Sequence, residues 1–195
     1  MTDHIAATVA DSLDVKRRFF DAHVADVQRA AQMIAAALKA KGKLLVFGNG
    51  GSAADAQHIA GEMINKFLRD RRPLPAIALT TDGGALTCIA NDMGFENVFA
   101  RQIEALGAKG DVCIAISTSG KSLNVTLACE QARKQGVTVI GFLGRDGGSV
   151  AALCDLALIV PSDDTQRIQE THNLMGHIIC EQVEAELFPD QKGEQ

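Results

Sequence analysis

Two polar side chains on one predicted helix have the chemistry of an acid–base or metal site. His58 and Glu62 are four residues apart, so on a helix over residues 53–67 they share one face, one turn apart. The spacing alone leaves three interpretations open: half of a metal site, an acid–base pair, or a pair of solvent-exposed side chains. The segment before this helix favours the two reactive interpretations, because it is typical of a ligand-binding loop.

That segment reads as a buried strand over residues 44–47, a turn with the sequence Gly48-Asn49-Gly50-Gly51-Ser52, and the start of the helix. Glycines allow positive φ and a close approach of backbone to ligand, and a helix start presents free N–H groups and a positive dipole end. The sequence therefore predicts an anion-binding loop directly before the helix that carries His58 and Glu62.

A second polar loop, Ser117-Thr118-Ser119-Gly120-Lys121-Ser122, follows a predicted strand over residues 112–116. Residues 115–122 nearly match a nucleotide-triphosphate loop, but Ala115 replaces its first glycine. Residues 48–53 fit a dinucleotide fingerprint, with Asp82 as a ribose-binding candidate, yet a loop rich in hydroxyls has no role in hydride transfer. Hydroxyls combined with backbone amides suit a phosphomonoester better, so no nucleotide cofactor is expected.

The elements that must position these loops form an α/β pattern. Short apolar strands over 44–47, 76–80, 112–116, 138–142 and 156–160 alternate with helical segments. This alternation predicts a doubly wound, five-stranded parallel sheet of the flavodoxin-like kind, covered on both faces. If the strand order is 2-1-3-4-5, the order reverses between strands one and three, and the two polar loops meet in one crevice there.

Helices are predicted at both ends of the chain. Apolar spacing indicates two helices over 3–22 and 24–40, so residues 1–41 are expected to form a helical hairpin that packs against other subunits. Residues 42–188 form the α/β core of a single domain spanning 1–195, and 189–195 form a tail. A long final helix to about residue 187 carries Gln169 and His177, separated by about 12 Å of helical rise. One helix brings both to a single metal only at the limit of side-chain reach; the alternative is a contribution from two subunits.

Composition narrows the classes of function. The chain has 195 residues, a net charge of −5 and no basic block, which argues against a nucleic-acid partner. Neither a signal peptide nor an apolar run of membrane-spanning length is expected. The five cysteines occur singly in apolar surroundings, without a C-x-x-C pair, and are expected to be reduced core residues of a cytoplasmic protein.

Five motifs together closely resemble one family: the glycine loop continuing to Gln57-His58-Ile59-Ala60-Gly61-Glu62, then Ala90-Asn91-Asp92-Met93-Gly94, the serine loop, Gly144-Arg145-Asp146-Gly147-Gly148, and Arg167-Ile168-Gln169-Glu170-Thr171-His172. They resemble the phosphoheptose isomerases of the sugar isomerase (SIS) domain superfamily, over about residues 5–188. The resemblance implies a homotetramer with active sites between subunits and one zinc ion per site. It implies these substrate-binding residues: Asn49, Gly50, Gly51, Ser52, Glu62, Asn91, Asp92, Ser117, Thr118, Ser119, Ser122 and Gln169. It also implies His58, Glu62, Gln169 and His177 as metal ligands.

The implied reaction converts D-sedoheptulose 7-phosphate to D-glycero-D-manno-heptose 7-phosphate, the first step toward ADP- or GDP-heptose for lipopolysaccharide, capsule or another glycoconjugate. Glu62 is expected to be the base and His177 the acid, with Asp92 orienting the substrate or His177. Lys66 departs from the family, in which many members carry arginine one turn after the glutamate, so a phosphate- or acid-orienting role there is in doubt.

A replication-initiation factor that binds the DnaA initiator closely resembles the same family, including the Leu187-Phe188-Pro189 ending, and uses the fold as a tetrameric adaptor. That adaptor lacks the glutamate and histidine found here as Glu62 and His177, so their presence favours an enzyme. A phosphosugar-sensing module needs the two loops but neither of these residues.

Overall fold

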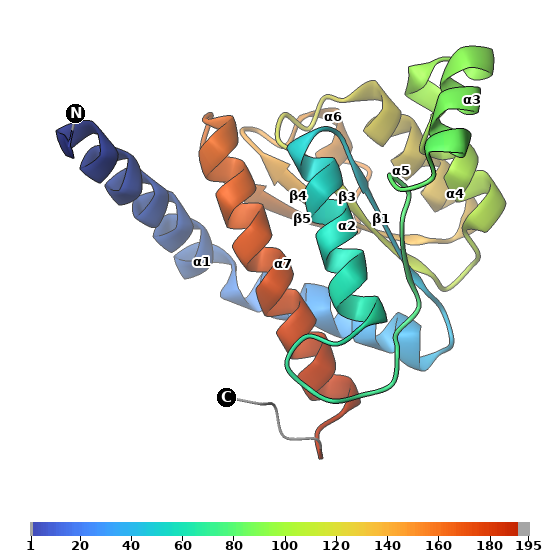
Figure 1. Ribbon diagram of the computed structural model, residues 1–195, viewed down its shortest axis with the longest axis horizontal. Helices are drawn as coiled ribbons and strands as arrows, with labels where there is room; N and C mark the ends of the chain where they lie inside the picture. Colours follow the sequence, from blue (N-terminus) through green and yellow to red (C-terminus); the bar gives the residue numbers. More distant parts are fainter. Residues whose placement is uncertain (1, 191–195) are drawn as a thin grey trace.

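The computed structural model, which describes residues 2–190, is organised around a five-stranded parallel sheet (Figure 1). The strands are β1 (Leu44–Gly48), β2 (Ala76–Ala78), β3 (Val112–Ser117), β4 (Thr138–Gly144) and β5 (Leu156–Val160), in the order β2-β1-β3-β4-β5. The fold class and strand order predicted from the sequence are confirmed. Every residue of β1 and β3 is buried, as expected for continuous apolar strands covered on both faces.

Helices cover both faces of the sheet. One face carries α1 (Thr2–Lys39), α2 (Gly51–Ile64) and α7 (Thr165–Leu187), while the other carries α3 (Gly83–Met93), η1 (Phe95–Asn97), α4 (Ala100–Leu106), α5 (Leu123–Gln135) and the short α6 (Gly148–Ala151). Alternate residues of β1 supply the two cores: Leu44 and Val46 pack under α1, α2 and α7, and Leu45 and Phe47 pack on the opposite side.

Strand register brings the two polar loops together. Gly48, the last residue of β1, pairs with Ile116, the residue before Ser117 at the end of β3. Both strands run in the same direction, so the glycine loop and the serine loop leave the same edge of the sheet side by side. The glycine loop leads directly into α2, which packs against α7.

The N-terminal helical hairpin predicted over residues 1–41 is wrong, because one continuous helix, α1, runs from Thr2 to Lys39. The chain around residue 23 contains no glycine or proline, so nothing in the backbone breaks the helix there. His23 instead supports its continuation: its Nδ1 lies 3.0 Å from an Asp26 carboxylate oxygen, and its ring packs on Phe19 at 5.0 Å. The tail predicted over 189–195 falls mostly outside the described residues.

The cysteine prediction needs one correction. All five cysteines are unpaired, and Cys113, Cys129 and Cys180 are buried and Cys154 half-buried, but Cys88 is exposed on α3. Cys88 lies on the solvent-facing side of α3, whose buried side is formed by Ile89, and this position outweighs the general tendency of cysteine to be buried. No helix among residues 2–190 is long and apolar enough to cross a membrane.

Candidate active site

Two cavities lie next to one another between α2 and α7. The first, here called the basket, is walled by the glycine loop, the serine loop and the first turns of α7, and has a volume of about 280 Å³. Its lining residues are Asn49, Gly50, Gly51, Ser52, Ile116, Ser117, Thr118, Ser122, Thr165 and Gln169. The crevice predicted between strands one and three is therefore present, and it is large enough for a small molecule.

The basket is lined by helix N-termini and hydroxyl groups, which are suited to binding an anion. The N-termini of α2 and α5 both open into it, and neither Gly50 nor Ser122, the residues that precede these helices, makes a side-chain cap hydrogen bond. No side chain occupies either helix start. Ser52 N and Ala53 N of α2 already donate to the backbone carbonyls of Asn49 and Gly50, so an anion here would be bound mainly by the remaining first N–H groups and the positive dipole ends of the two helices. The Ser117 and Ser122 hydroxyl oxygens lie 3.3 Å apart and add further donors.

Lys121 does not serve the basket as a phosphate-binding lysine. Its ammonium group is exposed and pairs with Asp146 at 3.4 Å. This supports the inference from Ala115 that the serine loop is not a nucleotide-triphosphate loop. Ser119 faces its own loop, where its Oγ accepts a hydrogen bond from Lys121 N at 3.2 Å.

Asn49 is held by a residue that sequence reasoning missed. The side-chain amides of Asn49 and Asn124 exchange two hydrogen bonds of 2.9 and 2.8 Å, and Asn124 is buried in the first turn of α5. This amide pair ties the glycine loop to the helix that follows the serine loop. Nothing in the local sequence distinguishes Asn124 from an ordinary polar residue of a helix N-terminus.

The second cavity contains His58, Glu62 and His177, here called the histidine cluster. His58 Nε2 lies 3.0 Å from a Glu62 carboxylate oxygen and 3.1 Å from His177 Nε2, and the two imidazole rings meet edge to face at 4.8 Å. His58 is exposed and Glu62 is half-buried, as in a surface pair, but the two are not isolated, because His177 approaches them from α7. His177, expected to point inward, is half-buried and faces α2.

The space inside the cluster is about 10 Å³, close to the smallest volume that holds one water molecule. It suits a single ion or water and not a sugar carbon. The three side chains offer one ligand atom each, all within 4.8 Å of one another. Two donors on one tetrahedral zinc ion lie about 3.3 Å apart, and a His₂Glu set with an open fourth position is typical of catalytic zinc. The donor set therefore fits zinc.

Two ionisable neighbours, Asp55 and Cys180, line the same cavity as the cluster. Burial raises the pKa of the Asp55 carboxyl, against the lowering effects of a hydrogen bond from Asn173 and of the His58 charge. Burial, with the nearby Glu62 and Glu184 carboxylates, raises the pKa of Cys180 to about 12, so this lining residue is a neutral thiol at neutral pH. The positions of these neighbours beside the cluster depend on helix packing, which residue spacing within one helix does not determine.

The structure separates two groups of predicted site residues from the cluster. Gln169, expected among the metal ligands, lines the basket, where its amide nitrogen would lie 2.5 Å from a Cβ added to Gly51. Asn91 and Asp92 are exposed on the last turn of α3, hydrogen-bonded to each other at 2.7 Å, and line neither cavity. Figure 1 places α3 on the far side of α2 from α7.

Comparison with known proteins gives a consistent set of relatives. The model of the SIS domain family matches residues 9–144. The phosphoheptose isomerase of Clostridium acetobutylicum is 48% identical, with both chains covered completely, and that of Aquifex aeolicus is 50% identical over 94% of this chain and 96% of its own. The structure of the phosphoheptose isomerase of Neisseria gonorrhoeae superimposes with a TM-score of 0.90 at 44% identity, covering 94% of this chain and 98% of the other.

Proposed function

This chain belongs to the SIS domain family, and from that membership and the two cavities we infer a sugar-phosphate isomerase. The chain converts D-sedoheptulose 7-phosphate to D-glycero-D-manno-heptose 7-phosphate. One observation carries this conclusion: relatives about 50% identical over nearly the full length of both chains are phosphoheptose isomerases. The same observation disfavours a replication-initiation adaptor or a phosphosugar sensor.

The two cavities bind opposite ends of the substrate. The basket binds the phosphate through the N-termini of α2 and α5 and through the serine hydroxyls. A seven-carbon chain with its phosphate on C7 carries its reacting carbons, C1 and C2, at the opposite end. Gly51 and His58 are seven residues apart on α2, which is about 10 Å of helical rise, so the reacting end reaches the mouth of the histidine cluster.

The proton chemistry is assigned to Glu62 and His177. Glu62 removes a proton from C1 of the open-chain ketose and returns it to C2, through an enediolate. His177 gives a proton to O2 and accepts the proton that leaves O1, and the same exchange assists ring opening. No net proton is gained or lost, as an isomerisation requires.

We propose that His58, Glu62 and His177 hold one zinc ion, with Gln169 as a further ligand only if its side chain leaves the basket wall. When bound, zinc would polarise the substrate carbonyl and stabilise negative charge on the adjacent oxygens. A carboxylate engaged by a cation is a weaker base, and an imidazole nitrogen bound to a cation carries no proton. Glu62 therefore acts as base when at least one of its oxygens is free, and His177 acts as acid when its Nε2 is free of the ion. Zinc added to chelator-treated protein should raise the melting temperature, and His58→Gln should abolish most of that rise; equal shifts in both proteins would overturn this assignment.

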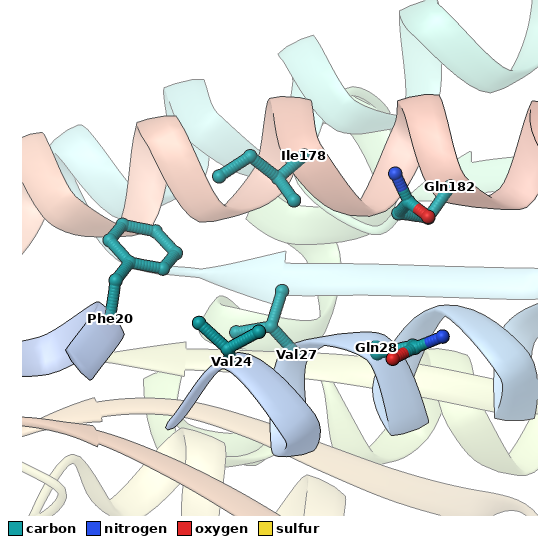
Figure 2. A pocket seen from close by; sticks show the side chains of 6 residues that line it. All are labelled: Phe20, Val24, Val27, Gln28, Ile178 and Gln182. Atoms are coloured by element: carbon teal, nitrogen blue, oxygen red, sulfur yellow. The ribbon is translucent and has the colours of Figure 1, made fainter. Parts of the chain in front are cut away.

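We further propose a homotetramer with active sites between subunits, in the cytoplasm. Support comes from α1, whose exposed apolar side chains include Ile5, Val9, Leu13 and Val24, with 53–65% of each accessible. Figure 2 shows a groove between α1 and α7 lined by Phe20, Val24, Val27, Gln28, Ile178 and Gln182, which offers such an interface mostly apolar surface. In such a tetramer, Asn91 and Asp92 contribute to the active site of a neighbouring subunit and not to the cavities of their own chain. Five unpaired cysteines suit a reducing compartment.

The direct test is incubation of the purified protein with sedoheptulose 7-phosphate, followed by NMR detection of the aldose product. We expect a heptose with a C1 aldehyde or hemiacetal signal, and deuterium at C2 when the reaction is run in D₂O. Glu62→Gln protein at the same concentration is the control. Absence of the aldose with wild-type protein would contradict the proposed function.

A further inference from the structure

Residues 65–73, here called the strap, connect the end of α2 to the segment that enters β2. Figure 1 shows this segment passing around the C-terminal end of α7, which lies more than 100 residues later in the chain. The strap has almost no regular secondary structure. Its conformation must therefore be fixed by contacts with the elements it crosses.

The main contact is Glu184 on α7, whose side chain is fully buried. Its carboxylate accepts hydrogen bonds from the backbone N–H groups of Phe67, Leu68 and Arg69 at 2.8, 2.8 and 3.0 Å. Burial alone acts to raise the pKa of Glu184, but these three donors and the charge of Arg71 bring it below its usual value. A carboxylate that stays ionised in the interior thus holds three successive backbone groups in one place.

Arg71 completes the arrangement from within the strap. Its side chain is 1% exposed, and its Nε donates to Glu184 at 2.7 Å. Its two terminal nitrogens donate to the carbonyl oxygens of Glu62 at 2.8 Å and Met63 at 2.9 Å. These carbonyls belong to the last turn of α2, where helices leave carbonyl groups unpaired and favour a cation. Arg71 therefore links the helix end that carries Glu62 to the helix that carries His177.

One side chain of the strap, Phe67, contacts the histidine cluster. The ring of Phe67 stacks on the imidazole of His177, with centroids 5.4 Å apart and an interplanar angle of 22°. His58 meets the same imidazole edge to face. His177 is thus confined between an aromatic ring from the strap and an imidazole from α2.

We propose that Phe67 is a positioning residue for His177, and that the buried Arg71–Glu184 pair acts through the strap to hold Phe67 in place. The inference rests on the proposed function, in which His177 exchanges protons with O1 and O2. Proton transfer depends on hydrogen-bond geometry, so an imidazole free to rotate about its side-chain bonds spends less time aligned with these oxygens. The proposed unit touches no substrate atom and is distinct from the basket.

The alternative is that the strap only closes the end of α2 and stabilises the fold. The two roles differ in what a substitution changes. Loss of a positioning ring lowers kcat and leaves KM nearly unchanged, because the phosphate is bound in the basket. Loss of a purely structural ring lowers the melting temperature without this selective effect on kcat.

The test compares Phe67→Leu, Phe67→Tyr and a matched control, Phe188→Leu. Phe188 is another half-buried ring packed against the same core, and it contacts Arg72 at the far end of the strap instead of a histidine. We expect Phe67→Leu to lower kcat about tenfold with KM within twofold, Phe67→Tyr to restore most of the rate because it keeps the ring, and Phe188→Leu to match wild type in kcat. Equal kcat values for Phe67→Leu and Phe188→Leu would overturn the proposal.

The role of the buried pair is tested in the same assay with Glu184→Gln. If Glu184 acts through Phe67, the double variant Glu184→Gln/Phe67→Leu loses no more kcat than the more impaired single variant. Multiplied losses would show that Glu184 acts by another route and would overturn its part of the proposal. Where Glu184→Gln fails to fold, the Phe67 series still decides whether the ring positions His177.

A measurement without substrate separates this inference from the proposed function. Crystal structures of Phe67→Leu and Phe67→Tyr report the orientation of the His177 imidazole directly. We expect it to leave His58 Nε2 in the leucine variant and keep that contact in the tyrosine variant. An unchanged imidazole in Phe67→Leu would contradict the positioning role even if the wild-type protein made aldose, and a failure to make aldose would leave this structural result standing.

Discussion

The basket and the histidine cluster share the same two walls, α2 and α7, but are built from different parts of the chain. The basket is made of backbone N–H groups and hydroxyls at the ends of β1 and β3, and it encloses about 280 Å³. The cluster is made of imidazoles and a carboxylate from the sides of two helices, and it encloses about 10 Å³. The donors of the basket suit an anionic group, and the small cavity of the cluster suits a single ion or water molecule.

In the proposed function, this difference separates substrate binding from proton transfer by a few turns of helix. Backbone amides and serine hydroxyls do not titrate near neutral pH. In the proposed function, the affinity for the substrate phosphate therefore does not change with the proton transfers at the cluster. The cluster instead places a Glu62 carboxylate oxygen and His177 Nε2 at 3.0 and 3.1 Å from His58 Nε2. Substitutions in the two regions should therefore change different kinetic constants.

The largest effect is expected from the cluster. Glu62→Gln and His177→Gln should each lower kcat by about 10³-fold while changing KM little, because each replaces a proton-transfer group by an amide that does not titrate, and the phosphate is bound elsewhere. Steady-state rates of aldose formation measure this, with circular dichroism to verify folding. Near-normal rates in both variants would show that the cluster is not the reaction centre.

A second expectation concerns the two histidines of α7, which belong to different regions. His172 is completely buried against the sheet, with Nε2 2.9 Å from the Leu143 carbonyl oxygen, and burial lowers its pKa to about 4. The usual histidine pKa is about 6.5, so as the pH falls the unfolded chain binds this proton before the folded protein does. The contribution of neutral His172 to the free energy of unfolding is therefore complete above pH 6.5 and is lost as the pH falls toward 4. Between pH 7 and pH 5 the loss in unfolding free energy should be about 2 kcal/mol.

Urea unfolding at a fixed protein concentration measures this loss, and His172→Gln provides the control. Glutamine can still donate to the Leu143 carbonyl but does not titrate, so the variant should lose less stability over the same pH range. An equal pH dependence in both proteins would show that His172 is not the titrating group. His177, which is half-buried and faces α2, has no comparable burial.

The sequence predicted the basket better than the cluster, for a physical reason. Parallel strands in the order 2-1-3-4-5 place the ends of strands one and three side by side, so two polar loops at those ends had to meet. The approach of His177 to His58 depends instead on how α7 crosses α2, which residue spacing within one helix does not determine. The strap depends on Glu184, whose contacts lie 115 to 117 residues away in sequence.

One other miss has a local cause. The break predicted near residue 23 came from apolar spacing, but a helix ends only where the backbone or its caps end it, and none do before Lys39. Asn91 and Asp92 were expected by family resemblance in a site between subunits; within one chain they line neither cavity, so their place in the site stays a prediction.

A smaller effect is expected from the basket. Ser122→Ala removes a hydroxyl that lines the cavity, at the residue just before α5. KM should rise about tenfold with kcat within twofold, since a hydrogen bond to a charged group contributes about 1.5 kcal/mol or more. Ser149→Ala is the matched control, because its hydroxyl lies beside the same helix and bonds to Gly120 O without lining the cavity. A fall in kcat with unchanged KM would place Ser122 in the reaction step.

The smallest effect decides to which region Gln169 belongs. A Cβ on Gly51 would come 2.5 Å from the amide nitrogen of Gln169, the far end of a flexible side chain, so Gly51→Ala should move that side chain at a cost of about 1 kcal/mol or less. Gly48→Ala is a contrasting variant, because its Cβ would meet the Ile116 carbonyl oxygen at 2.8 Å and a backbone atom cannot move away as easily. If Gln169 serves the basket, Gly51→Ala raises KM about two- to fivefold and leaves kcat unchanged. If Gln169 instead joins the histidine cluster during turnover, kcat falls and KM does not change. Gln169 would then belong to both regions.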